Sequence, residues 1–115
     1  DEVVVWGTGN PRREFIYSED FVGASQFLMN NYDGDGIVNV GHGEDVSIKE
    51  LAERMATITG FKGQIRFDET KPDGTMQKLL DSTYMASLGW KPRVSLDEGI
   101  KQTYQWYADS VKKQN

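Results

Sequence analysis

The stretch from Val3 to Asp20, VVVWGTGNPRREFIYSED, decides how this chain starts to fold. Its first four residues are three valines and a tryptophan, and such residues fit the pleated, buried surface of a strand. The strand is predicted to stop at segment 7–11, a turn whose two glycines adopt backbone angles that other residues avoid. The turn delivers two adjacent arginines, Arg12 and Arg13, and residues 15–17 then return to an extended apolar pattern.

The residue types in this segment suggest a binding site. A guanidinium is a permanent cation with a planar fork of N–H donors, and Trp6 provides a flat aromatic surface close to it in the sequence. This combination suits a ligand that carries both a phosphate and a ring. In the plainer interpretation, Trp6 fills the core and both arginines are solvated, and spacing alone favours that interpretation.

Composition limits the possible functions of the chain. Its 115 residues predict one domain, residues 1–115. Thirteen Lys and Arg against eighteen Asp and Glu give a net charge of −5, which disfavours nucleic acid as a partner but leaves room for a local cationic pocket. Without cysteine and with one histidine, disulfides, a thiolate nucleophile and a zinc site are not expected. No apolar run reaches membrane-spanning length and no leader is visible, so we expect a cytoplasmic protein without membrane contacts.

The remaining sequence alternates predicted helices and strands, which indicates a small α/β fold of a few short strands with three or four helices. The helix over 47–59 has the clearest signals, because Ser47 and Glu50 form a capping box and Gly60 provides a stop. Further helices are predicted from Ser18 to about 30, over 82–88 and over 95–111, and further strands over 37–40 and 64–67.

Two apparent ligand motifs are incomplete. The turns Gly7-x-Gly9 and Gly41-x-Gly43 each lack the third glycine of a dinucleotide-binding fingerprint. Asp33-x-Asp35 with Glu44 resembles half of an EF-hand, but Ile37 and Val38 occupy the positions of a ligand and of the sharp-turn glycine. We therefore expect neither a cofactor site nor a metal site in this chain.

Three motifs resemble those of GDP-L-fucose synthases, which are epimerase-reductases of the extended short-chain dehydrogenase/reductase superfamily. The first two are similar to that family's substrate motifs, and the third is common to the wider superfamily. They read Trp6-Gly7-x-Gly9-x-Pro11-x-Arg13-Glu14-Phe15 with Asp20 after a gap, Lys71-Pro72-Asp73-Gly74-Thr75-x-x-Lys78-Leu79-Leu80-Asp81, and Asn39-Val40-Gly41-x-Gly43-x-Asp45-x-Ser47-Ile48. The resemblance covers nearly the whole chain but only the C-terminal third of such an enzyme.

This resemblance implies a substrate-binding domain for a GDP-sugar. The family converts GDP-4-keto-6-deoxy-D-mannose to GDP-L-fucose with NADP, and the matching motif positions imply that Trp6, Arg13, Asp73 and Lys78 bind the substrate. In the family pattern, the aspartate contacts the nucleotide-sugar and the lysine supports its phosphates. Arg12 matches no fixed position and is expected to be a surface charge.

The resemblance also implies that cofactor binding and catalysis belong to another domain of the same enzyme. The NADP-binding glycines and the catalytic Ser/Tyr/Lys set are expected in an N-terminal Rossmann domain upstream of Asp1, and no tyrosine here has a lysine four residues later. The chain alone is therefore expected to have no catalytic residue and no activity, while the full-length enzyme is expected to be a homodimer. Cutting away the partner should expose apolar surface around Phe15, Phe21 or Trp90. Two alternatives stay open: the substrate domain of another nucleotide-sugar epimerase or dehydratase, and a non-catalytic nucleotide-sugar-binding module.

Overall fold

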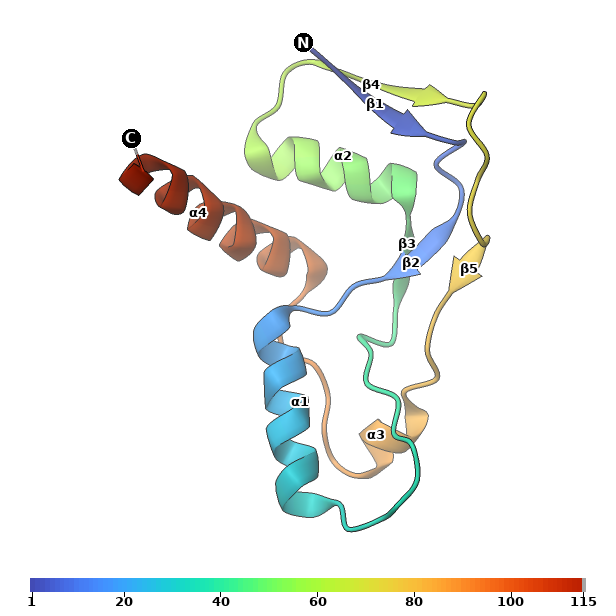
Figure 1. Ribbon diagram of the computed structural model, residues 1–115, viewed down its shortest axis with the longest axis vertical. Coiled ribbons are helices and arrows are strands. Elements are labelled where there is room, and N and C mark those ends of the chain that lie inside the picture. Colours follow the sequence, from blue (N-terminus) through green and yellow to red (C-terminus); the bar gives the residue numbers. More distant parts are fainter. Residues whose placement is uncertain (115) are drawn as a thin grey trace.

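The computed structural model describes residues 1–114. This part of the chain contains four helices and five short strands, joined by loops. Along the chain they are β1 (Glu2–Trp6), β2 (Arg12–Glu14), α1 (Ser18–Asn31), β3 (Asp45–Ser47), α2 (Ile48–Thr59), β4 (Gln64–Asp68), β5 (Gln77–Lys78), α3 (Thr83–Ser87) and α4 (Leu96–Gln114). Figure 1 shows α1 and α4 extending in different directions from a central region of strands. The expected α/β architecture with few short strands is confirmed.

The strands form two separate small sheets. β1 pairs with β4 in parallel, so that Val3 lies opposite Ile65 and Trp6 lies opposite Asp68. This pairing confirms the strands predicted around 3–6 and 64–67. The second sheet has the order β3-β2-β5, with β2 antiparallel to β3 and parallel to β5. Its strands have only two or three residues, which is too short for an alternating pattern to be visible in the sequence.

Helix α2 begins and ends as its sequence predicts. The Ser47 hydroxyl accepts a hydrogen bond from the Glu50 backbone N–H at 3.0 Å, and the Glu50 carboxylate accepts one from the Ser47 N–H at 2.8 Å. Two of the backbone donors at the helix start are satisfied in this way. At the other end, Gly60 adopts a left-handed conformation with φ of 73°, which residues with a Cβ avoid.

Helix α1 is tied to the rest of the fold by a carboxylate in its first turn. Asp20 is buried, and its Oδ2 accepts hydrogen bonds from the backbone N–H groups of Arg93 and Val94 at 3.0 and 2.9 Å. These bonds join the start of α1 to the loop that precedes α4. In the sequence, Asp20 is identified only as the last position of the first motif, because its hydrogen-bond partners lie more than seventy positions away.

The strand predicted over 37–40 is wrong. This segment belongs to no sheet, and the Ile37 side chain is 95% exposed. Its β-branched residues favour an extended backbone, but within residues 1–114 no neighbouring strand supplies the hydrogen-bond partners that a ladder needs. Residues 15–17 likewise lie beyond the end of β2 and are not part of a strand.

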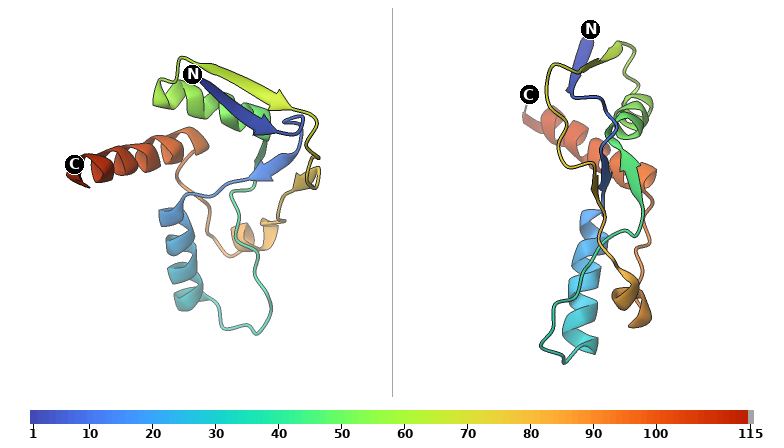
Figure 2. Two further views of the ribbon diagram at one scale, coloured as in Figure 1. Left: turned by 45° about the horizontal axis from the view of Figure 1, so that its top comes forward. Right: turned by 90° about the vertical axis from the view of Figure 1, so that its right-hand side faces the viewer.

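The molecule is a flat slab with an unusually large surface. Its extents are 51 × 38 × 19 Å, and the edge-on view in Figure 2 shows how thin it is. Its radius of gyration is 17.1 Å, whereas a compact chain of this length has about 13 Å. Its accessible surface is 8422 Å², against about 6,300 Å² for a folded monomer of this mass.

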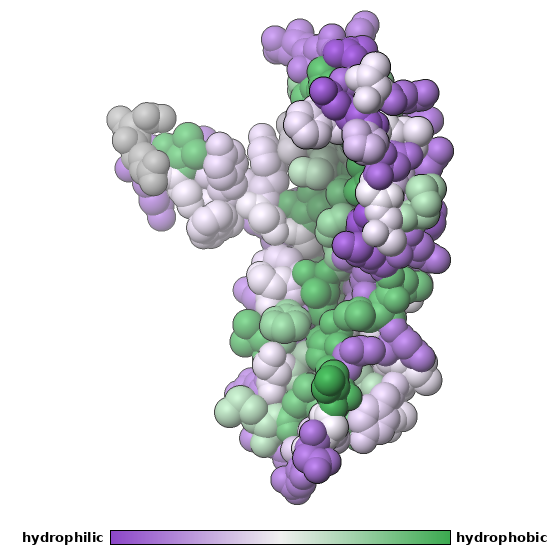
Figure 3. Space-filling model, turned by 45° about the vertical axis from the view of Figure 1, so that its right-hand side comes forward, coloured by the Kyte–Doolittle hydropathy of each residue, from purple (hydrophilic) through white to green (hydrophobic). Residues whose placement is uncertain are grey.

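Apolar side chains remain on this surface. Ala24 and Met85 are the hydrophobic residues that are buried within the described part of the chain. Of the three aromatic residues expected to be exposed, Phe21 is half-exposed, while Phe15 and Trp90 are intermediate. Figure 3 shows a band of apolar side chains on the side that carries β5 and α3. Among residues 1–114, no helix combines the length and hydrophobicity that are needed to cross a membrane.

Candidate functional site

Two cations from distant parts of the sequence meet in the second sheet. Arg13 in β2 lies directly opposite Lys78 in the parallel pairing with β5. Residues opposite each other in a ladder project from the same face of the sheet, so both side chains leave on one side. The structure therefore brings together the two predicted phosphate-binding residues, although their role in binding remains a prediction.

The Arg13 guanidinium is hydrogen-bonded to the backbone of the preceding residue, and a loop lies close to it. Its Nη1 donates a hydrogen bond to the backbone carbonyl of Arg12 at 2.7 Å. A Cβ added to Gly74 would lie 3.2 Å from Nη2 of Arg13, a tighter spacing than most real Cβ contacts. Gly74 thus lets the backbone of the β4–β5 loop pass close to the guanidinium. Its position explains why a glycine suits this place in the Lys71-Pro72-Asp73-Gly74 motif.

Trp6 lies at the end of β1 and does not fill the core. It is 72% exposed, so the plainer interpretation of this residue is wrong. The ammonium of Lys71 lies 5.6 Å from the centre of its ring, within the range of a cation–π contact. The structure thus presents an open aromatic face beside a cation on the loop that leads to Lys78.

Asp73 faces the neighbouring loop of its own chain. Its two carboxylate oxygens accept hydrogen bonds from the backbone N–H and the hydroxyl of Thr8, at 2.8 and 2.7 Å. These two bonds, the hydroxyl bond first, hold the pKa of the Asp73 carboxyl below its ordinary value. Gly7 also shapes this contact, because a side chain there would collide with the Asp73 carboxylate. The resemblance implies substrate contact for Asp73, and Thr8 was not predicted, because its place in the Gly7-x-Gly9 turn gave no signal of a distant partner.

Arg12 is a partly exposed charge of the second sheet, and it is ion-paired. Its Nε lies 2.8 Å from Asp45 Oδ1 in β3, and its Nη1 lies 3.6 Å from Glu50. The Asp45 side chain, 9% exposed, also accepts a hydrogen bond from Gln77 of β5 at 2.7 Å. The bond from Gln77, followed by the bond from Arg12, lowers the pKa of Asp45. One carboxylate thereby connects all three strands, which leaves Arg13 on the opposite face.

Glu14 is a second residue whose role was not predicted from the sequence. Its Oε2 accepts a hydrogen bond from Gly43 N at 2.6 Å, and its Oε1 accepts one from Leu80 N at 3.2 Å. The carboxylate therefore bridges the segments on both sides of β2, just beyond the end of the sheet. A Cβ at Gly41 would collide with it. The one available signal was the position of Glu14 beside Arg13 in the first substrate motif.

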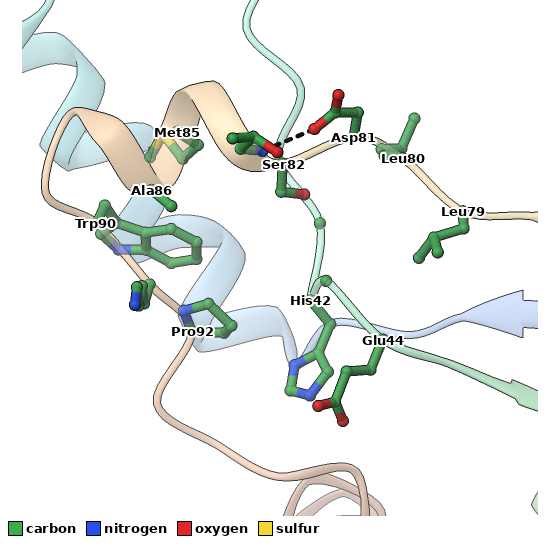
Figure 4. A pocket seen from close by; sticks show the side chains of 14 residues that line it. His42, Glu44, Leu79, Leu80, Asp81, Ser82, Met85, Ala86, Trp90 and Pro92 are labelled. Carbon is green, nitrogen blue, oxygen red and sulfur yellow. Dashed lines mark hydrogen bonds between the residues drawn. The ribbon is translucent and has the colours of Figure 1, made fainter.

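A hollow of the molecule begins directly after Lys78. Its volume is about 800 Å³, and its lining includes Leu79, Leu80, His42 and Trp90. Figure 4 shows the Trp90 indole facing it from one side and the two leucines from the other, with His42 between them at its border. None of the four predicted substrate residues lines this hollow, and Arg13 lines a smaller one of about 170 Å³. The two cations thus lie beside this hollow of about 800 Å³ and do not line it.

In each glycine turn, one backbone N–H is already hydrogen-bonded to a carboxylate of this chain. The Thr8 N–H of the first turn binds the Asp73 carboxylate, and the Gly43 N–H of the second binds the Glu14 carboxylate. A backbone donor occupied by a carboxylate of the same chain is not free to bind phosphate, and the negative charge repels it. The described residues also hold no group of three or more His, Asp or Glu side chains arranged for a metal ion.

Comparisons with known proteins agree with the sequence motifs. The profile of the NAD dependent epimerase/dehydratase family matches residues 1–41. The chain is 55% identical to Putative GDP-L-fucose synthase 2 of Arabidopsis thaliana over 111 residues, which are 96% of this chain and 34% of that protein. The chain therefore spans about a third of the length of such curated relatives.

Solved structures share the fold over the same extent. A GDP-L-fucose synthetase from Naegleria fowleri bound to NADP superposes with a TM-score of 0.91 at 27% identity, covering 96% of this chain and 36% of that one. A UDP-glucose 4-epimerase of Thermotoga maritima with UDP-glucose gives a TM-score of 0.85 at 28% identity, covering 96% and 36%. The resemblance to GDP-L-fucose synthases and to the extended short-chain dehydrogenase/reductase fold is confirmed.

Proposed function

We propose that this chain is the substrate-binding part of an NADP-dependent epimerase-reductase that converts GDP-4-keto-6-deoxy-D-mannose to GDP-L-fucose. The observation that carries the proposal is the placement of Arg13 opposite Lys78, in a chain whose curated relatives are GDP-L-fucose synthases. The domain comprises residues 1–115. A cytoplasmic location stays a prediction.

The two cations account for recognition of the pyrophosphate. A sugar nucleotide carries two formal negative charges there, and water holds them strongly. Arg13 and Lys78, side by side on one sheet face, replace part of that hydration with charge-assisted hydrogen bonds. The chain as a whole carries −5, so the attraction is local to this face. The exposed ring of Trp6 offers a surface on which a flat ring can pack.

The chemistry itself is assigned to a partner domain. Both glycine turns bind carboxylates of this chain, which supports placing NADP and the catalytic Ser/Tyr/Lys set in a Rossmann domain of the same enzyme. The residues described here bind the remote nucleotide and so fix the sugar against that active site, which raises the effective concentration of the reacting groups. On this proposal the chain alone is inactive, and the complete enzyme is a homodimer.

The shape of the chain supports a large partner. Its surface exceeds that of a compact monomer by roughly 2,000 Å², and a standard protein–protein interface buries about 800 Å² on each partner. The curated relatives are about three times as long as this chain, and their additional length can cover such a surface. The Rossmann domain implied by the resemblance is the partner that we propose for it.

Titration of the chain with GDP and UDP in a calorimeter tests the nucleotide assignment. We expect GDP to bind more tightly than UDP, and we expect Arg13→Ala to weaken GDP binding. To test the complete function, residues 1–115 replace the matching third of the Arabidopsis enzyme, whose NADPH-dependent formation of GDP-L-fucose is then measured. A preference for UDP, or a folded chimera that binds NADPH but forms no GDP-L-fucose, contradicts the proposal.

A second candidate rests on the structural comparison with the UDP-glucose 4-epimerase. Its TM-score shows that the same scaffold serves a UDP-sugar, so this chain can instead be the substrate domain of another nucleotide-sugar epimerase or dehydratase. The calorimetric preference between GDP and UDP separates these two candidates. A non-catalytic nucleotide-sugar-binding module is a third, which binds GDP normally but gives an inactive chimera.

A further inference from the structure

We propose that Glu14 is a positioning residue that keeps Lys78 beside Arg13 before a ligand binds. Its carboxylate links the segments that follow β2 and β5 directly beyond their last ladder position, so that the two cations are already side by side when an anion arrives. This inference deepens the proposed function, on which its binding readout rests, while the contacts of Glu14 themselves rest on geometry alone.

The strand pairing that holds Lys78 in place is short. β2 and β5 share two ladder positions, which are Arg12 with Gln77 and Arg13 with Lys78. Among the described residues, β5 is an edge strand, because β2 is its one neighbour in the order β3-β2-β5. The two positive charges at the second position repel each other across the ladder. A pairing of this length therefore gains from any further link close to the two cations.

A hydrogen bond outside the ladder lies at each end of this pairing. At the first end, Arg12 N donates to the Met76 carbonyl at 2.7 Å. At the second end, Leu80 N donates to Glu14 Oε1 at 3.2 Å, two residues after Lys78. The backbone ladder thus stops at Lys78, and the Glu14 side chain continues the connection between the two strands. Glu14 closes the end of the pairing at which the two cations lie.

The second oxygen of the same carboxylate is anchored on the other side of β2. Glu14 Oε2 accepts a hydrogen bond from Gly43 N at 2.6 Å, shortly before β3 begins. Two glycines of this turn permit the contact. A Cβ at Gly41 would collide with the Glu14 carboxylate, and Gly43 has φ of 92°, a left-handed conformation that favours glycine. Because one oxygen is anchored in this way, the oxygen that binds Leu80 N has a fixed position.

The position of Glu14 in the strand separates its hydrogen bonds from its charge. Successive side chains of a strand project from opposite faces, so Glu14 lies on the other face of β2 from Arg13. From there, its negative charge opposes the binding of an anion beside Arg13. Electrostatics alone therefore predicts that removal of Glu14 tightens anion binding, whereas the positioning role predicts that removal weakens it. The two explanations differ in the sign of one measurable effect.

Double-mutant cycles with GDP as the probe test this role. We expect Glu14→Ala to weaken GDP binding roughly three- to tenfold. In the Lys78→Ala background the same change should have almost no effect, because the ammonium that Glu14 positions is then missing. In the Trp6→Ala background it should keep its full effect. Unchanged or tighter GDP binding in Glu14→Ala, or an equal loss in all three backgrounds, overturns the inference.

A milder variant and a matched control complete the binding experiment. Glu14→Gln keeps one oxygen acceptor, so it should lose less affinity, and it replaces Glu14→Ala in the cycles if the alanine variant does not fold. The control, Glu44→Ala, removes the same charge from an exposed acid that lines the small hollow beside Arg13. We expect it to leave GDP binding unchanged or tighter. If it weakens GDP binding as much as Glu14→Ala, the loss does not come from the two hydrogen bonds of Glu14, and the inference is wrong.

A measurement without ligand separates this inference from the proposed function. The Arg12 amide, bonded to the Met76 carbonyl, reports the far end of the β2–β5 pairing. We expect Glu14→Ala to accelerate its hydrogen exchange roughly three- to tenfold and Glu44→Ala to leave the rate unchanged. If the wild type does not bind GDP but the Arg12 amide responds as expected, the proposed function fails and the role of Glu14 in holding the two strands together is supported. An unchanged Arg12 exchange rate in a folded Glu14 variant overturns that role.

Discussion

Arg13 and Lys78 lie directly opposite each other on neighbouring parallel strands, with no acidic residue at their register positions. On the other side of β2, the residue opposite Arg13 is Val46. Like charges at opposite positions of a ladder are unfavourable, and a bound anion relieves their repulsion. The ladder positions of Arg13 and Lys78 therefore favour an anionic ligand, while the small hollow that Arg13 lines also contains the acids Glu44 and Asp97.

Removing either cation should weaken nucleotide binding. We expect Arg13→Ala and Lys78→Ala each to raise the GDP dissociation constant roughly ten- to a hundredfold, since each removes a charge-assisted hydrogen bond. In a complete enzyme containing this chain, the same variants should sharply raise the Michaelis constant for the GDP-sugar. Isothermal titration calorimetry and steady-state kinetics measure the two effects.

The matched control for these variants is Lys101→Ala, an exposed cation on α4. It lowers the net charge by the same amount but lies outside the sheet. If Lys101→Ala weakens GDP binding as much as Lys78→Ala, the attraction comes from overall charge. An unchanged GDP affinity in both Arg13→Ala and Lys78→Ala contradicts the proposed site.

The repulsion between the like charges of Arg13 and Lys78 predicts that a variant of Lys78 is more stable than the wild type. Replacing Lys78 by Gln keeps a polar side chain, one atom shorter, but removes one of the two opposed charges. We expect the free energy of unfolding without ligand to rise by roughly 0.2–0.5 kcal/mol. Urea denaturation at low ionic strength measures it, and added salt should reduce the gain. A loss of stability in Lys78→Gln shows that the ammonium has a favourable partner in the free protein.

Local signals in the sequence predict much of this fold. Helix α2 is an example, because its capping box and its terminal glycine are both neighbours in the sequence. The strands around Val3 and Ile65 were also predictable from their apolar residues. The central sheet was not, since its strands are short and are joined by contacts such as Asp45 with Arg12 and Gln77, which come from three separate segments.

The candidate site shows the same division. Arg13 and Lys78 were found through motifs, and the common ligand that the resemblance implies predicted that they converge; their direct pairing in one ladder was not predicted. Thr8 and Glu14 were missed because each acts on a residue far away in the sequence. The strand predicted over 37–40 fails for the opposite reason: its local signal is strong, but no partner strand is present among the described residues.

Trp6 should matter for binding and little for stability. It is 72% exposed, so Trp6→Ala should change the free energy of unfolding by less than about 1 kcal/mol, the size of an exposed cation–π contact. We expect the same variant to weaken GDP binding at least about fivefold, the effect of losing one base–aromatic stack. The contrasting variant is Met85→Ala, at a site that is 1% exposed, which should cost about 2–5 kcal/mol. Urea denaturation and calorimetry give both quantities, and a large stability loss in Trp6→Ala places the indole in the core.

The exposed apolar surface should make the isolated chain associate. A surface roughly 2,000 Å² larger than that of a compact monomer leaves apolar side chains in contact with water. We expect light scattering to show concentration-dependent association, which adding the proposed partner domain should suppress. A monodisperse monomer with high thermal stability contradicts this expectation.

The stability of the second sheet should fall in acid because of Asp45. Hydrogen bonds from Gln77 and Arg12 lower the pKa of this carboxyl in the folded state. A group whose pKa is lowered by folding stabilises the fold above its ordinary pKa of about 4, and this contribution is lost as the pH falls through the lower folded value. Between pH 7 and 5, Asp45 should therefore add no slope, and below about pH 4 it should make unfolding easier.

Asp45→Asn isolates this contribution from the other acids that titrate in the same range. Asparagine keeps the shape of the side chain but has no carboxyl proton to bind, so the variant should be less stable than the wild type at pH 6 and should lose less stability between pH 6 and 3. Asp35→Asn, in the exposed loop after α1, is the matched control and should follow the wild-type curve. Urea denaturation at pH 6 and pH 3 gives the free energy of unfolding of each variant relative to the wild type. If Asp45→Asn loses as much stability on acidification as the wild type, the acid sensitivity comes from other carboxylates. The hydrogen bonds of Asp45 to Arg12 and Gln77 then do not couple folding to protonation.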